Sequence, residues 1–171
     1  ILDDEKKVEQ ILKTAQQIQF GCFDEFSKSH LLVLRLLAYC PNPITKKCLI
    51  DMLDLIEPFA TDIINKLFNC NVIGEIADRT TGQTLYRIKD DFLSDIIMKG
   101  CSSTECLFYK TKIYHFIQKG IIEATLKQKL ELAIFLGEEN ALYLLFQVLN
   151  LEDVSWEKKA NCIDKLLCSM T

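Results

Sequence analysis

Glycine and proline are scarce in this chain of 171 residues, with six and three copies respectively. Turns between strands draw heavily on both residue types, so their scarcity argues against an all-β or loop-rich fold. Hydrophobic residues make up 49% of the chain, which is enough to bury a core. The composition therefore predicts a mainly helical globular chain.

The chain also has no region with an excess of positive charge. Its net charge is −4, and residues 1–100 contain 12 Lys/Arg against 15 Asp/Glu, while residues 101–171 contain 8 against 9. A surface that binds a phosphate backbone needs clustered cations. This balance disfavours nucleic acid as a partner.

Recognisable metal and catalytic motifs are missing. None of the eight cysteines has CxxC spacing and only two histidines are present, which disfavours a metal site. Reduced, mostly buried thiols in a cytoplasmic protein are the expected use of these cysteines. The chain contains neither a phosphate-binding loop nor a serine nucleophile elbow. We therefore expect no catalytic residue and no cofactor.

A hydrophobic run long enough to cross a membrane, about 18 residues, is absent. The longest apolar segment, residues 31–40, is interrupted by Arg35 and ended by Pro41, so it predicts a buried helix and no membrane contact. Because the chain begins with Ile1 rather than Met, we expect it to be part of a longer polypeptide.

The first half of the chain has the spacing of amphipathic helices. Apolar residues recur at helical intervals over residues 3–19, 30–39, 45–53 and 57–70. Ser27 or Ser29 is expected to cap the second of these helices and Thr45 the third, while Pro58 suits the first turn of the fourth. The fourth helix is expected to bury one face, formed by Phe59, Ile63, Ile64, Leu67 and Phe68.

Two β-prone segments follow, residues 72–76 and 84–88, separated by a polar turn that contains Gly82. This pattern predicts a β-hairpin, and a helix is expected over residues 90–99. Three helices followed by a hairpin form the element order of a winged helix. The predicted fold class is thus mainly α, with a winged helix over residues 21–100; an irregular helical bundle that carries one hairpin is the alternative. Residues 1–20 are expected to form a leading helix, which can belong to an upstream domain.

Residues 101–171 have helical periodicity throughout, over residues 103–120, 121–136, 139–150 and 153–169. Short connections between helices of similar length favour antiparallel neighbours. We predict a helical-repeat-like bundle here, although the sequence has no repeat of fixed period.

The third of these helices is apolar on nearly all sides, and such a helix must be covered on most faces. Either its neighbours bury it or it contacts a further repeat or a partner. Trp156 can likewise serve as a packing anchor or as an interface residue. The candidate partner contacts are Trp156, Tyr143 and Phe146. His30 and His115 are expected to have packing or capping roles.

Nucleic-acid binding through the winged helix is the alternative function. Its candidate contacts are Lys66, Asn65, Arg79 and Arg87. The fourth predicted helix, however, contains Glu57, Asp62 and Lys66 and has a net charge of −1, which opposes its approach to phosphates.

Several segments together resemble a known family. These are SKSHLLVLRLLAYCPNPITKKCLIDML (27–53), DIINKLFNCNVIGEI (62–76), YRIKDDFLSDII (86–97) and YKTKIYHFI (109–117). They resemble the winged helix and first repeat helices of signal-transduction ATPases with numerous domains (STAND), such as MalT-type regulators, soluble adenylyl cyclase and NACHT-type receptors. In this resemblance Tyr86 and Ile88 fill strand positions, Asp91 matches the family aspartate and Ile113 matches a family isoleucine.

The resemblance implies a switch or scaffold position behind a nucleotide-binding core. The family histidine that approaches the nucleotide phosphate falls on Asp90, and a carboxylate repels phosphate. The second family histidine falls on Lys110. We therefore expect a non-catalytic regulatory or interaction module of a multidomain signalling protein. Its expected partner is a protein, either an upstream domain of the same chain or a separate chain.

Overall fold

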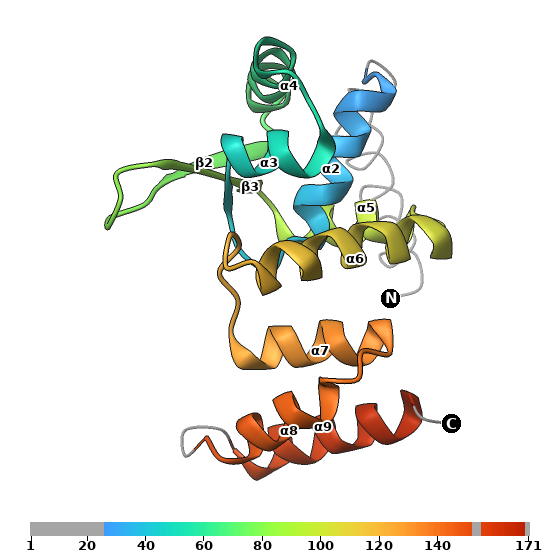
Figure 1. Cartoon of the computed structure of the whole chain (residues 1–171). Coiled ribbons are helices and arrows are strands. Elements are labelled where there is room, and N and C mark those ends of the chain that lie inside the picture. Colours follow the sequence, from blue (N-terminus) through green and yellow to red (C-terminus); the bar gives the residue numbers. More distant parts are fainter. Residues whose placement is uncertain (1–25, 152–154, 170–171) are drawn as a thin grey trace, which may run out of the picture.

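Helices dominate residues 26–151 and 155–169, the part of the chain that the computed structural model describes (Figure 1). The prediction of a mainly helical chain is confirmed, and the leading helix predicted within residues 1–20 lies outside the described residues. The elements in chain order are α2 (Lys28–Tyr39), β1 (Ile44–Thr45), α3 (Lys46–Leu53), α4 (Glu57–Asn69), β2 (Ile73–Ala77), β3 (Thr84–Ile88), α5 (Asp91–Lys99), α6 (Ser103–Gln118), α7 (Leu126–Leu136), α8 (Ala141–Leu149) and α9 (Trp156–Ser169).

The predicted hairpin is present. β2 and β3 pair antiparallel, with Ile73 opposite Ile88 and Ala77 opposite Thr84. In the turn between them Gly82 has a φ of 67°, a conformation that side-chain-bearing residues rarely adopt. The hairpin extends away from the helices (Figure 1).

A further strand, β1, was not predicted. Ile44 and Thr45 pair antiparallel with Tyr86 and Leu85 of β3, so the sheet of the described residues has the order β1-β3-β2. A two-residue strand has no periodicity of its own. It exists only because β3 supplies the hydrogen-bonding partners.

Side-chain caps begin several helices as expected. Thr45 Oγ1 accepts a hydrogen bond from the Cys48 amide at 3.1 Å. At the start of α2 the Ser27 amide donates to His30 Nδ1 at 3.3 Å, so His30 has the predicted capping role. Burial, and then the charge of Lys66, lower the pKa of His30, which favours the neutral ring that can accept this bond. His115 is exposed on α6 and belongs to neither hydrophobic core, and its ring contacts Phe116 edge to face with the centroids 6.2 Å apart.

The larger hydrophobic core lies among α2, the sheet, α3, α4 and α5. Ile63, Ile64 and Leu67 of α4 are buried in it as predicted. Phe59 and Phe68 are exposed instead, because Ala60 occupies the inward position of the first turn and the apolar face is narrower than expected.

Helix α6 contributes to two cores. Tyr109, Ile113 and Ile117, spaced four residues apart, belong to the larger core. Tyr114 belongs to a second cluster, which it shares with buried residues of α7, α8 and α9. Figure 1 shows α6 between the sheet-bearing part and these three helices. The predicted domain boundary at residue 100 therefore separates α6 from the larger core, to which α6 contributes buried residues.

Polar contacts reinforce this packing. Lys112 Nζ of α6 donates to the Met52 carbonyl near the end of α3 at 2.8 Å. Asn42 Nδ2 donates to the Glu123 carbonyl, also at 2.8 Å. The first bond satisfies a carbonyl in the last turn of α3, where a partner within the helix is missing. The second fixes the connection between α6 and α7 against the segment that precedes β1.

Helix α7 begins later than predicted. Residues 121–125 are not helical, and the helix begins at Leu126 after the N-cap Thr125. The Thr125 side chain accepts from the Gln128 amide at 3.3 Å, and Gln128 Oε1 accepts from the Thr125 amide at 2.9 Å. This reciprocal capping box stops the helix from extending toward Ile122, which is buried in the larger core.

Candidate interaction surface

One face of α8 is apolar and exposed. Leu142, Tyr143 and Phe146 are 49%, 65% and 64% exposed. At about 100° per residue they project to one side of the helix, opposite the buried Ala141, Leu144, Leu145 and Val148. Of the two alternatives for this helix, burial by neighbours holds for its inner face, while Leu142, Tyr143 and Phe146 stay exposed among the described residues. Leu142 belongs to this surface although it was not among the candidates; its spacing of four residues from Phe146 is the signal that identifies it.

The same face has almost no polar character. The segment ALYLLFQVL that forms α8 contains no Asp, Glu, Lys or Arg. Exposed helix faces in soluble proteins are normally charged or polar. Aromatic and aliphatic side chains gathered without charge are the usual composition of the centre of a protein interface.

Trp156, the first residue of α9, is a further exposed aromatic residue, with 79% of its surface accessible. The ammonium of Lys159 lies 5.3 Å from the centroid of its ring. Trp156 is therefore not a packing anchor among the described residues. Leu167 of the same helix is 57% exposed, and an interval of eleven residues, about three turns, places it on the same side as Trp156.

A groove of about 960 Å³ lies beside α6, α7 and α9. Two of the residues that line this groove are Lys110 and Phe135, and the Lys110 ammonium lies 3.4 Å from the centroid of the Phe135 ring. Lys165 Nζ of α9 forms an ion pair with Glu131 of α7 at 3.2 Å. These charges are already paired with one another or with a ring. Lys110, the position of the second family histidine, therefore has a structural partner in Phe135.

The candidate nucleic-acid contacts lie on different elements. Lys66 and Asn65 are on α4, Arg79 lies in the hairpin turn and Arg87 lies on β3. Arg79, Arg87 and Asn65 are exposed. The Lys66 ammonium lies 5.9 Å from the centroid of the Phe26 ring, so it is directed back toward the start of α2.

The outer face of α4 contains no basic residue. The four residues farthest from its buried face are exposed, as helical periodicity requires: Pro58, Asp62, Asn65 and Asn69. Of these, Asp62 has a negative charge and the two asparagines are neutral. A helix that enters a DNA groove needs cations or amides directed outward, and here only the amides are available.

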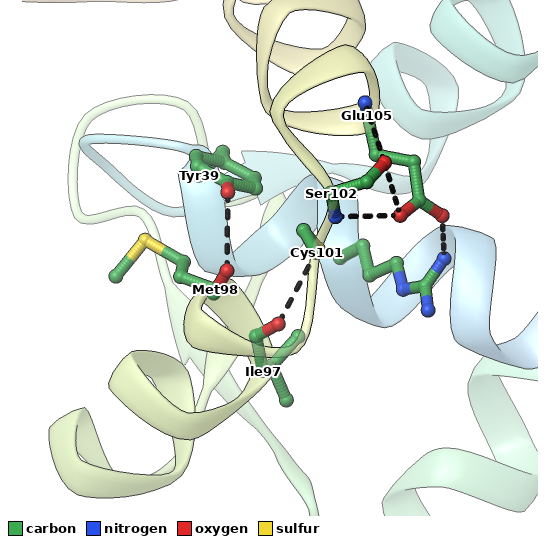
Figure 2. A network of polar contacts seen from close by, with 7 residues as sticks. Tyr39, Ile97, Met98, Cys101, Ser102 and Glu105 are labelled. Carbon is green, nitrogen blue, oxygen red and sulfur yellow. Dashed lines mark hydrogen bonds and ion pairs between the residues drawn. The ribbon is translucent and has the colours of Figure 1, made fainter.

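A polar network joins α2, α5 and α6 (Figure 2). The Tyr39 hydroxyl donates to the Met98 carbonyl at 3.4 Å, and the Cys101 thiol donates to the Ile97 carbonyl at 3.3 Å. Burial, followed by a hydrogen bond with Cys106, raises the pKa of Tyr39. Burial likewise raises the pKa of the Cys101 thiol. Neutral groups of this kind donate hydrogen bonds and are poor nucleophiles or bases.

Glu105 is the acidic member of this network. Its carboxylate accepts from the Ser102 amide at 2.9 Å and from the Ser102 hydroxyl at 3.0 Å (Figure 2). These bonds are the main cause of its lowered pKa, to which Arg35 of α2 adds an ion pair. The network therefore fixes the start of α6 against α2 and α5.

Asp90, at the position of the phosphate-approaching family histidine, is the N-cap of α5. Its Oδ1 accepts from the Phe92 amide at 2.7 Å. Asp and Asn are preferred at this position because they satisfy an otherwise unpaired amide. The capping of α5 therefore explains why an aspartate stands at position 90, and no contact with a nucleotide is needed to explain it.

Comparison with models of known families, with curated proteins and with solved structures finds no match for this chain. Within residues 26–151 and 155–169, no helix is long and apolar enough to cross a membrane. No cluster of three or more His, Cys, Asp or Glu residues in that part of the chain could hold a metal ion.

Proposed function

We propose that this chain is a non-catalytic interaction module in which a winged helix, formed by α2 to α5, is joined to a helical array, formed by α6 to α9. In this proposal the module belongs to a larger cytoplasmic signalling protein of STAND type. The α8 face and Trp156 contact another protein or another domain of the same polypeptide.

The exposed, uncharged face of α8 is the observation that carries the proposal. Tyr143 and Phe146 together present two aromatic rings that the described residues leave largely uncovered. Burial of an aromatic side chain removes about 150–250 Å² of apolar surface from water, so an unpartnered face of this kind costs solubility. Exposed apolar side chains that gather on one face of a protein are typical of a binding site.

The order of elements supports the winged-helix part of the proposal. Helix, helix, helix, hairpin and helix follow one another as the sequence predicted, and β1 adds a short strand on the other side of β3. The resemblance to STAND proteins is supported only by segments of sequence. At the position where that family has its phosphate-approaching histidine, this chain has Asp90, which caps α5.

The packing of α6 supports a regulatory role. A change in the position of α6 would alter the larger core and the second cluster together, because Ile113 lies in one and Tyr114 in the other. A movement of the winged helix would therefore reach α7 to α9 through packed side chains. This is the physical requirement for a module that relays the state of one domain to another.

DNA binding is the second candidate, and the exposed Arg79 and Arg87 near the hairpin favour it. The absence of cations on the outer face of α4 opposes it. A titration with duplex DNA at 50 and 200 mM salt separates the two functions. Contacts to six or more phosphates would lower the affinity at least a thousandfold over this range, whereas the proposed function predicts no such binding.

The proposed function is tested by photo-crosslinking in cells that produce the whole polypeptide. A benzophenone amino acid at position 146 is expected to form a covalent adduct with protein, either within the polypeptide or with another chain. The matched control is position 92, since Phe92 is also a half-exposed phenylalanine, 50% exposed on α5. Equal adduct yields at positions 146 and 92 would contradict the proposal.

A further inference from the structure

We propose that the occupant of the α8 face is a second copy of this chain, bound across a two-fold axis near Phe146. This inference rests on the proposed function, because it names the partner of the same surface. The surface comprises Leu142, Tyr143, Phe146, Trp156 and Leu167 and is called the α8–α9 face below.

The charge of the α8 face favours a copy of itself. In a two-fold dimer each patch meets the same patch, so a charged residue near the axis meets a like charge. Because α8 contains no Asp, Glu, Lys or Arg, two copies meet without this repulsion. An acidic or basic partner would gain nothing from this helix.

The exposed area is consistent with a weak dimer. Two half-exposed leucines and three aromatic residues that are 64–79% exposed leave on the order of 600 Å² per copy, when scaled from the 150–250 Å² that each aromatic side chain buries. A standard interface buries about 800 Å² per partner. Two copies would together bury about 1,200 Å², which is at the low end of specific interfaces, where weak and transient complexes lie.

The position of Phe146 favours a two-fold arrangement. It lies close to the middle of α8, and Leu142 lies one turn before it on the same face. In an antiparallel pair of α8 helices, Phe146 of each copy packs against Leu142 and Phe146 of the other. Antiparallel helices also place opposite ends of their dipoles side by side, which is favourable.

Analytical ultracentrifugation of the purified 171-residue chain between 1 and 200 µM tests the inference. The expected result is a species of twice the 19.7 kDa chain mass at high concentration. The combined substitution Tyr143→Ser and Phe146→Ser should raise the dissociation constant at least tenfold, because it removes the two aromatic side chains nearest the axis. Phe92→Ser on α5 should leave the dissociation constant unchanged.

Two results would overturn the second-copy inference. One is a monomer at every concentration, and the other is a dimer that the double substitution leaves intact. If the chain is monomeric but position 146 still crosslinks to a different protein, the second-copy inference is wrong and the proposed function still holds. If the chain is monomeric and the adduct yield at position 146 is no higher than at position 92, both the second-copy inference and the proposed function are wrong. Circular dichroism of the double variant verifies that it remains folded, and Phe146→Gln supplies a milder replacement if it does not.

Discussion

Arg35 of α2 and Glu105 of α6 form an ion pair between residues 70 positions apart in the sequence. The same carboxylate also accepts both hydrogen bonds from Ser102 at the start of α6. One side chain thus caps a helix and holds that helix against α2. The contact lies at the junction between the sheet-bearing part and α6, the helix that contributes to both cores.

Glu105→Gln should therefore destabilise the chain in a pH-dependent way. The pKa of Glu105 is lowered in the folded state, so its contribution is fully present above the ordinary value of 4.5 and is lost as pH falls through the folded pKa. Glutamine can still accept from Ser102 but has no charge for Arg35. Thermal unfolding should show a lower Tm for the variant at pH 7 and a smaller difference at pH 3. A Tm difference independent of pH would contradict this role of the charge.

Gly137→Ala should cost about 1 kcal/mol of stability, because Gly137 ends α7 with a φ of 68° that a Cβ makes unfavourable. Gly100→Ala is the matched control, since Gly100 ends α5 with a φ of −77° and its added Cβ would meet only ordinary contacts. Urea unfolding of both variants gives the comparison. Equal losses at the two positions would mean that the left-handed conformation is not the cause.

Substitutions on the two faces of α8 should have opposite consequences. Phe146→Ser should change the free energy of unfolding by no more than about 0.5 kcal/mol, as is usual for an exposed site. Leu145→Ala, one residue away on the buried face, should cost about 2–5 kcal/mol. Both are measured by urea unfolding at a chain concentration well below the dissociation constant of the proposed dimer. A large loss for Phe146→Ser would show that Phe146 belongs to the core.

The two cores should unfold together. Ile113→Ala removes a fully buried side chain of α6 from the larger core and should cost about 2–5 kcal/mol. If α6 couples the cores, amide hydrogen exchange in α8 should accelerate in this variant as much as exchange in α2. Unchanged protection of α8 would mean that the second cluster is stable independently.

The local features of the fold were predictable because short-range signals encode them. Thr45 as an N-cap, Gly137 as a helix end and the hairpin around Gly82 each follow from a residue type at a fixed position. The start of α7 was also encoded, since Thr125 and Gln128 have the spacing of a capping box, but helical periodicity in residues 121–125 concealed it.

Features that depend on distant partners were not predictable in the same way. β1 needs β3, about 40 residues away, before Ile44 and Thr45 become a strand. Phe59 was assigned to the inner face of α4 because it is apolar, yet the position of α4 on the larger core leaves it outside. The candidates Tyr143, Phe146 and Trp156 are exposed as an interface requires, while their partner stays a prediction.

A crosslinking experiment with the benzophenone at position 146 on the α8 face or at position 65 on the outer face of α4 shows which of the two faces binds a partner. We expect protein adducts at position 146, and at position 65 no nucleic-acid adduct and a protein yield near that of position 92. Nucleic-acid adducts at position 65, together with a position 146 yield no higher than that of position 92, would contradict it and assign the binding surface to α4.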